Sequence, residues 1–139
     1  MPDNRFFIDS NILIYAFARE GDLSHKKQIA VNLLSQSPML STQIINECSN
    51  VLRRKFNWTY PEIRETFEFV LKISTVVNVS IATIQQAWLI GEKYGYSYFD
   101  SLVLASALES HCDILYSEDM QDGQLIESCL KIVNPFKVS

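Results

Sequence analysis

The feature that most constrains the fold is a regular alternation of short apolar runs with longer amphipathic segments. The short runs are typical of buried strands and fall at residues 5–9, 39–42, 75–79, 113–117 and 131–134. Helical spacing of apolar side chains occupies residues 24–35, 42–56, 61–74, 82–94 and 98–111, and a last helix is predicted near residues 123–130. Strands that alternate with helices indicate a parallel sheet covered on both faces. We therefore predict an α/β fold, a three-layer α/β/α sandwich around a mostly parallel sheet of about five strands.

The length and the composition agree with a single domain over residues 1–139, since no linker, repeat or low-complexity tract divides the chain. No apolar run approaches the roughly 18 residues of a membrane span. The acidic start of the chain is unlike a secretory signal. The three cysteines, Cys48, Cys112 and Cys129, show no paired spacing and are expected to be reduced thiols. These observations favour a cytoplasmic protein.

Acidic residues stand at the ends of predicted strands or near the starts of predicted helices: Asp9, Glu47, Asp100, Asp119 and Asp122. The carboxyl ends of parallel strands share one edge of a sheet, where such folds bind ligands. Carboxylates brought together there repel each other unless a cation compensates them, and Mg²⁺ or Mn²⁺ prefers oxygen ligands. Metal-held carboxylate clusters support hydrolysis of phosphoesters by an activated water. The sequence shows no nucleophilic Ser or Cys with a partner histidine, so metal-assisted hydrolysis fits its residues best.

Three of these acids also have a purely structural interpretation. Asp9 could cap a helix that starts near Asn11, as Asp often does after a strand. Ser97 and Asp100 have the spacing of a capping box. Glu47 could belong to a solvated polar stripe of its helix. Each signal is weak alone, and the joint placement of the acids carries the argument.

The remaining charged residues leave similar alternatives open. Asp119 and Asp122 could be turn formers. The basic run Arg53, Arg54 and Lys55 could complement the dipole of a helix end, or Arg53 and Arg54 could bind a nucleic-acid substrate. The formal net charge of −4 argues against a nucleic-acid partner, but this objection weakens if the candidate acids are neutralised by a metal.

Three segments carry these acids in characteristic surroundings, namely FIDSNILIYAF, STQIINECSNVL and YSYFDSLVLASALESHCDILYSEDM. In their order and spacing they resemble the motifs of the PIN-domain family, and specifically the VapC-type toxins of bacterial and archaeal toxin–antitoxin pairs. The ending KIVNPF also resembles the last strand of that family. The resemblance spans nearly the whole chain.

The resemblance implies a role for particular residues. Asp9, Glu47 and Asp100 match the first three metal-site acids, and Asn11 matches a supporting polar residue. Ser117 matches a supporting hydroxyl. The fourth ligand stays open between two candidates, Asp119 and Asp122.

The resemblance also implies an activity and partners. It implies a Mg²⁺- or Mn²⁺-dependent endoribonuclease that acts on cellular RNA, with tRNA a frequent target of the family, and that is inhibited by a cognate antitoxin. It further implies a homodimer, which the many apolar residues of the predicted helices 24–35 and 61–74, such as Phe67, Phe69 and Val70, also favour. The alternatives are another Mg²⁺-dependent phosphohydrolase and a catalytically silent PIN-type binding module.

Overall fold

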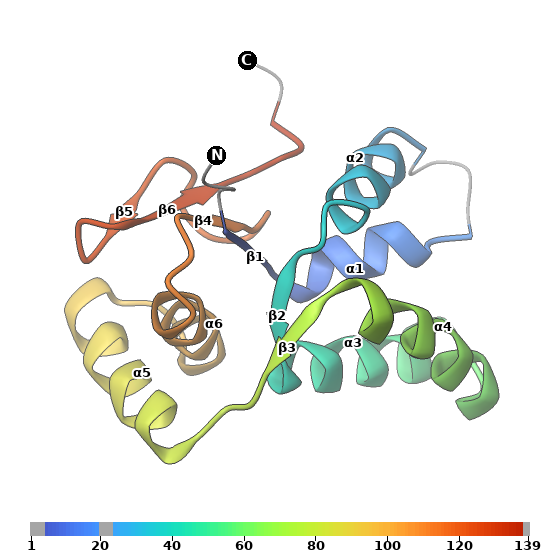
Figure 1. Ribbon diagram of the computed structural model, residues 1–139, viewed down its shortest axis with the longest axis horizontal. Coiled ribbons are helices and arrows are strands. Elements are labelled where there is room, and N and C mark those ends of the chain that lie inside the picture. Colours follow the sequence, from blue (N-terminus) through green and yellow to red (C-terminus); the bar gives the residue numbers. More distant parts are fainter. Residues whose placement is uncertain (1–4, 20–23, 138–139) are drawn as a thin grey trace.

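The computed structural model describes residues 5–19 and 24–137, and Figure 1 shows how their helices and strands are arranged. A six-stranded sheet has the strand order β3-β2-β1-β4-β6-β5. Its neighbouring strands are parallel, except that β5 and β6 are antiparallel. The strands are β1 (Phe6–Ile8), β2 (Met39–Ser41), β3 (Thr75–Val77), β4 (Ile114–Tyr116), β5 (Leu125–Ile126) and β6 (Leu130–Val133). The first residues of the chain, on which the expectation about a secretory signal partly rests, lie outside the described residues.

Helices cover both faces of this sheet. Figure 1 shows α1 to α4 on one side and α5 and α6 on the other. The helices are α1 (Ser10–Phe17), α2 (Ser24–Leu34), α3 (Thr42–Lys55), α4 (Tyr60–Ile73), α5 (Ile81–Tyr94) and α6 (Tyr98–Glu109). None of the helices in the described segments has the length and apolarity needed to cross a membrane. The predicted α/β fold with a mostly parallel central sheet is confirmed, and all five predicted strands are present.

The central strands are apolar because both of their faces are covered. Phe7, Ile8 and Leu115 are completely buried. Helix α6 is buried all round from residue 101 to residue 107, because it lies between the sheet and α5. A Cβ atom added at Gly91 of α5 would come within 3.0 Å of Ser101 Oγ, so the glycine permits a close approach of the two helices. This packing fixes the first turn of α6 at the edge of the sheet.

The helix predicted near residues 123–130 is wrong. This segment forms β5, a tight turn and the start of β6. Glu127 and Ser128 have φ values of 49° and 59°, and this left-handed backbone turns the chain back on itself. Ile126 and Leu130 pair across the turn. The same spacing of four residues would place them on one face of a helix, which explains the false helical signal.

Some of the apolar residues of helix 61–74 that were predicted to form a dimer surface lie in the core. Phe67 and Val70 are buried, so the prediction that they form free apolar surface is wrong. Phe69 and Leu71 of the same helix are 58% and 52% exposed. Helix α5 adds an exposed Trp88. Apolar surface therefore exists on the molecule, but on different side chains from those expected.

Two helices begin immediately after their strands at the carboxyl edge of the sheet. Asp9 is the N-cap of α1, and its side chain accepts a hydrogen bond from the Ser10 amide at 2.7 Å. Ser41 is the N-cap of α3, and its side chain accepts from the Ile44 amide at 3.3 Å. These caps satisfy amides that a helix start leaves unpaired. They also fix the backbone that carries Asp9 and, one turn into α3, Glu47.

Candidate active site at the carboxyl edge of the sheet

Asp9 is a buried carboxylate at the end of β1, only 6% exposed. Besides the Ser10 amide, the Ser117 hydroxyl donates a hydrogen bond to it at 2.9 Å. Burial raises the pKa of Asp9 to about 6, the two hydrogen bonds oppose this rise, and the charges of Asp100 and Asp119 add to it. Asp9 is therefore a helix cap and a member of an acidic cluster at the same time, so the two interpretations of this residue do not exclude each other.

Glu47 extends from α3 toward the same acids. Its Oε1 atom is buried and has no hydrogen-bond partner among the described residues. Burial raises the pKa of Glu47 to about 7, and the charges of Asp9 and Asp100 add to the rise. A buried carboxylate oxygen without a partner is costly, and a bound cation would satisfy it.

Asp100 lies in the first turn of α6 and is half-buried. Ser97 caps this helix by accepting from the Asp100 amide at 3.2 Å. Helices α4 and α5 have complete capping boxes, whereas α6 has only this one bond. Burial raises the pKa of Asp100, hydrogen bonding with Ser97 opposes the rise, and the charge of Asp119 adds to it. The helix cap expected from the spacing of Ser97 and Asp100 is therefore made by the Ser97 side chain alone. The carboxylate of Asp100 does not complete a capping box, and it faces the other acids.

Asp119 lies three residues beyond β4 and is exposed. The side-chain amide of Asn11 donates to its Oδ2 atom at 3.2 Å, while the buried Oδ1 atom of Asn11 has no partner among the described residues. Asn11 therefore contacts Asp119, and Ser117 contacts Asp9.

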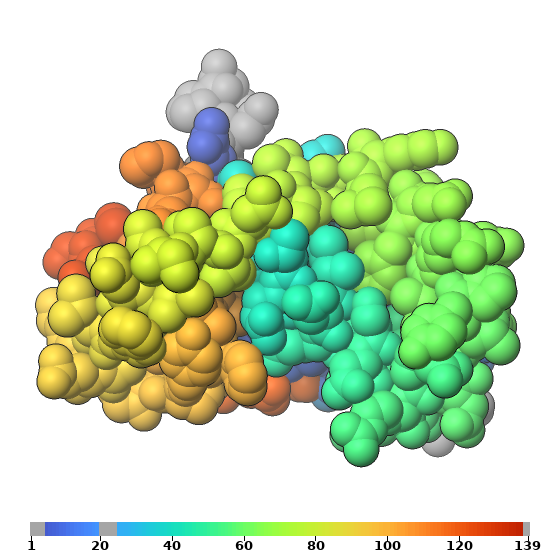
Figure 2. Space-filling model, turned by 90° about the horizontal axis from the view of Figure 1, so that it is seen from below, coloured from blue at the N-terminus to red at the C-terminus, as the bar shows by residue number. Residues whose placement is uncertain are grey.

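The four carboxylates of Asp9, Glu47, Asp100 and Asp119 come from four different segments and act on one another electrostatically. Figure 2 views the edge of the sheet at which β1 and β2 end, and there α3 and α6 flank a hollow in the surface. Within residues 5–19 and 24–137, no three His, Cys, Asp or Glu side chains are close enough to hold a metal ion in their present positions. Uncompensated carboxylates repel each other, so a bound ion would have to draw them together. The oxygen-only donor set and the unpartnered oxygens of Glu47 and Asn11 fit Mg²⁺ or Mn²⁺.

Asp122 is engaged elsewhere. Its carboxylate accepts from the Asn134 amide at 2.8 Å and lies 3.4 Å from the Lys137 ammonium group. The hydrogen bond from Asn134 is the main cause that lowers the pKa of Asp122, and nearby lysines contribute. Asp122 therefore ties the loop after β4 to the segment after β6. Of the two candidates for a fourth ligand, the geometry favours Asp119.

Arg53 and Arg54 lie in the last turn of α3 and contact none of the four acids. Arg53 donates to the Trp58 carbonyl at 3.0 Å, and its guanidinium group lies 4.4 Å from the centre of the Tyr60 ring. Together with Ser49, Asn50 and Tyr60 they line a surface hollow. Sequence reasoning missed Tyr60, because its position beside Arg53 depends on the turn between α3 and α4.

A second group that sequence reasoning missed surrounds Glu118, which lies between Ser117 and Asp119. The Tyr15 hydroxyl and the Lys26 ammonium group each lie 2.5 Å from a carboxylate oxygen of Glu118. Lys26 also lies 4.9 Å from the centre of the Tyr15 ring. This network joins α1, α2 and the loop after β4, and so fixes the backbone on either side of Glu118.

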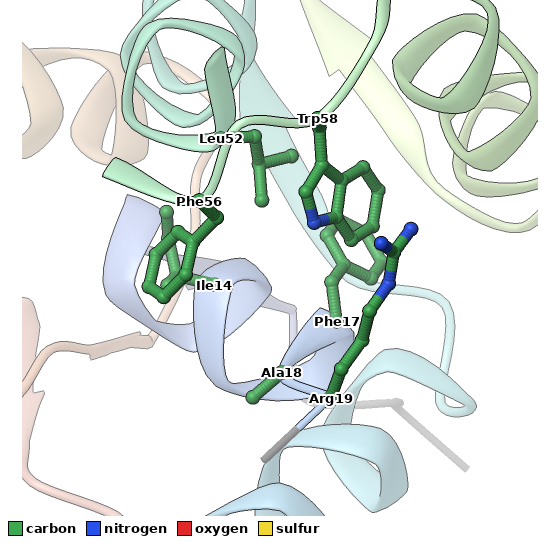
Figure 3. A pocket seen from close by; sticks show the side chains of 7 residues that line it. All are labelled: Ile14, Phe17, Ala18, Arg19, Leu52, Phe56 and Trp58. Atoms are coloured by element: carbon green, nitrogen blue, oxygen red, sulfur yellow. The ribbon is translucent and has the colours of Figure 1, made fainter. Parts of the chain in front are cut away.

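A separate hollow of about 200 Å³ lies between α1, α3 and the segment after α3. Figure 3 shows its lining side chains, Ile14, Phe17, Ala18, Arg19, Leu52, Phe56 and Trp58. The guanidinium group of Arg19 stacks on Trp58 at 4.1 Å. The hollow is largely apolar and contains none of the site acids.

Comparison with known proteins adds the family and the fold. A sequence model described as "PIN domain" matches residues 6–121. No curated protein matches the sequence. A toxin–antitoxin complex from Klebsiella pneumoniae superposes with a TM-score of 0.69 at 19% identity, over 96% of this chain and 99% of that chain. VapC20 of Mycobacterium tuberculosis, a sarcin–ricin loop cleaving toxin, superposes with a TM-score of 0.65 at 16% identity. The match covers 82% of this chain and 89% of that chain. VapBC2 from Rickettsia felis, bound to promoter DNA, superposes with a TM-score of 0.61 at 14% identity. The match covers 93% of this chain and 98% of that chain. At these identities the structures share a fold.

Proposed function

This chain belongs to the PIN-domain family, and we propose that it is a metal-dependent endoribonuclease, the toxin of a toxin–antitoxin pair. The observation that carries the proposal is the convergence of Asp9, Glu47, Asp100 and Asp119, with a buried oxygen of Glu47 left without a partner. A cluster of this kind raises the free energy of the folded protein unless a cation binds it. A metal-dependent reaction would explain why the chain places these acids together.

In this proposal the four acids would hold Mg²⁺ or Mn²⁺, which would neutralise charge on a phosphodiester and lower the pKa of a bound water molecule. The chain's own groups keep the acids in place. Ser117 and the Ser10 amide orient the two oxygens of Asp9. Asn11 orients Asp119. Burial keeps water away from Asp9, which strengthens the charge interactions of this carboxylate.

RNA is the substrate we propose. The solved structures that share the fold include a toxin named for cleaving the sarcin–ricin loop. On this chain, Arg53 and Arg54 supply positive charge in the last turn of α3, the helix that also carries Glu47. Guanidinium groups bind phosphates well because their donors are fixed in a plane. We assign Arg53 and Arg54 to substrate binding; tRNA is one candidate substrate.

The proposal includes partners and a compartment. Solved structures with this fold contain toxins together with antitoxins, and we propose a cognate antitoxin for this chain. We also propose a homodimer, supported by exposed apolar residues such as Trp88. Three free cysteines support a reducing compartment, the cytoplasm.

Incubation of the purified protein with RNA, in Mn²⁺ and in EDTA, tests the activity. Cleavage in Mn²⁺ that EDTA abolishes is the expected result. Absence of cleavage in either condition would favour a silent PIN-type binding module. Release of phosphate from small phosphoesters without cleavage of RNA would favour a different phosphohydrolase. Co-expression with the product of a short neighbouring reading frame should relieve the growth inhibition that the toxin causes in bacteria.

A further inference from the structure

The hollow at the end of α3 has a lining unlike that of an apolar docking groove. Its lining residues are Ser49, Asn50, Arg53, Arg54 and Tyr60. All are polar or carry a polar group, and the one ring among them is that of Tyr60. Tyrosine and arginine also occur at the centres of protein interfaces, where they are usually set among apolar side chains. This surface lacks an apolar anchor and offers cations, amide groups and one aromatic face.

The Tyr60 ring is held in place although it is 67% exposed. Tyr60 is the first residue of α4, and the preceding Thr59 forms a complete capping box with Glu62, with bonds of 2.8 and 3.2 Å. The Arg53 guanidinium group stacks on the ring at 4.4 Å and is itself fixed by the Trp58 carbonyl. A ring fixed in this way loses little entropy when a second planar group stacks on it.

No carboxylate in the part of the chain that the structure describes neutralises the two arginines of the hollow. Among the described residues, neither Arg53 nor Arg54 lies within 4 Å of a carboxylate, whereas four other cations do. Arg54 follows Glu47 by seven residues of the same helix, a rise of about 10 Å, and falls on the same side of α3. An RNA strand that crosses the acids and continues along α3 would therefore reach this hollow.

We propose that the hollow is a nucleotide subsite, in which an unpaired base stacks on Tyr60 and the phosphate beside it contacts Arg54 and Arg53. This inference rests on the proposed function, because the subsite would bind part of the same RNA that the acids cleave. Aromatic side chains stack on bases that are splayed out of a helix, whereas paired bases in an A-form duplex are not available to them. The subsite thus selects strands with an unpaired nucleotide near the cleaved bond.

Binding of a labelled single-stranded RNA oligonucleotide in EDTA, followed by fluorescence anisotropy, tests the subsite without cleavage. Tyr60→Leu should weaken binding roughly 5- to 150-fold, the range for loss of one stacked base. Tyr60→Phe should bind like the wild type. Arg54→Gln should weaken binding and lower the slope of log affinity against log salt by about one. Phe69→Leu removes an exposed ring of the same helix outside the hollow and serves as the matched control. Circular dichroism checks that each variant is folded.

The affinity for a duplex of the same sequence should depend on Tyr60 much less than the affinity for the single strand. In cleavage assays Tyr60→Leu should raise KM and keep kcat at saturating RNA. If the wild type cleaves no RNA but its RNA affinity depends on Tyr60, the proposed activity fails and the subsite stands. Equal RNA affinity of Tyr60→Leu, Phe69→Leu and the wild type would overturn the subsite. Loss of antitoxin binding in Tyr60→Leu with unchanged RNA affinity would also overturn it, by making the hollow a protein contact.

Discussion

Two carboxyl groups of the site hold protons at pH values where free carboxyl groups are charged. Burial raises the pKa of Asp9 to about 6 and that of Glu47 to about 7. Both groups lose contact with water on folding, and each then feels the charge of other acids. The folded protein therefore binds protons that the unfolded chain has released, and this difference can be measured.

The metal-free protein should become less stable as the pH rises from about 4 to 7. The folded-state pKa values of Asp9 and Glu47 lie above their unfolded values, so the stability that these protons provide is complete at low pH and is lost as the pH passes through 6 and 7. Folding lowers the pKa of other carboxylates, such as Glu118 and Asp122. Their contribution to the stability of the protein is lost only at more acidic pH. Thermal melts in EDTA at constant ionic strength measure the trend.

Glu47→Gln supplies the control for this trend, because it removes one of the two titrating groups. The melting temperature of this variant should fall less than that of the wild type over the same pH range. Mn²⁺ should raise the melting temperature of the wild type at neutral pH and have a smaller effect on the variant. A wild-type melting temperature that rises steadily from about pH 4 to 7 would contradict the assigned pKa values.

Asp119 and Asp122 should separate into a functional and a structural residue. Asp119→Asn removes a carboxylate that Asn11 orients toward the cluster, so metal-dependent cleavage should fall by roughly 10²-fold. Asp122→Asn should keep cleavage near the wild-type rate and lower the melting temperature, because its carboxylate accepts from Asn134 and lies near Lys137. Cleavage rates and melting temperatures of both variants test this. Loss of cleavage in Asp122→Asn with near wild-type cleavage in Asp119→Asn would show that Asp122, and not Asp119, is the fourth ligand.

At the scale of helices and strands, the sequence predicted what depends on local patterning. The five apolar strands and the helices that follow them were found because burial on both faces gives short, continuous apolar runs. The helix predicted near residues 123–130 failed because Ile126 and Leu130 have a spacing that a hairpin and a helix share. Only the backbone of Glu127 and Ser128 distinguishes the two, and spacing does not reveal it.

The residues of the candidate site also fall into those that the sequence could predict and those that it could not. The acids after strands could be found, because parallel topology brings strand ends to one edge. The choice between Asp119 and Asp122 could not be made, since it depends on which of them meets Asn134. Tyr15 and Lys26 were also missed, because their contact with Glu118 joins residues 92 or more positions apart in the chain.

The network around Glu118 should position the loop that carries Asp119. Tyr15→Phe removes the hydroxyl bound to Glu118 without changing any charge or the ring. Because one hydrogen bond contributes about 1 kcal/mol, we expect Mn²⁺ affinity and cleavage to fall roughly 5-fold. Calorimetric titration with Mn²⁺ and cleavage rates measure the two effects.

The chain offers a matched control in Tyr94, whose hydroxyl donates to Glu127 at 2.7 Å beside Lys93. This second group of Tyr, Lys and Glu contacts none of the four acids. Tyr94→Phe should lower stability by a similar amount and leave Mn²⁺ affinity unchanged. Equal Mn²⁺ affinities of Tyr15→Phe and the wild type would remove the positioning role.

At the scale of the whole molecule, the exposed apolar side chains predict self-association. Ile81, Trp88 and Leu89 of α5 are more than 60% exposed, and Phe69 of α4 is 58% exposed. Apolar surface gathered on one helix commonly marks an interface. Light scattering at tens of micromolar should give about twice the chain mass of 16.0 kDa.

Trp88→Glu and Phe69→Glu test which helix forms the interface, since a charge there should dissociate the dimer. The variant that becomes a monomer identifies the helix involved. A wild-type mass of 16.0 kDa under these conditions would remove the homodimer.

The central claim is that the acids at the edge of the sheet carry out metal-dependent cleavage of RNA, and Asp9→Asn tests it most directly. Asparagine keeps the size of the side chain and can still pair with the Ser10 amide and Ser117, while the buried charge is removed. The variant should therefore fold, as judged by circular dichroism, and growth inhibition on expression in bacteria should disappear. The decisive measurement is the rate of RNA cleavage in Mn²⁺ by folded Asp9→Asn beside the wild type. A rate lower by roughly 10²-fold or more is predicted, whereas an unchanged rate would contradict the mechanism.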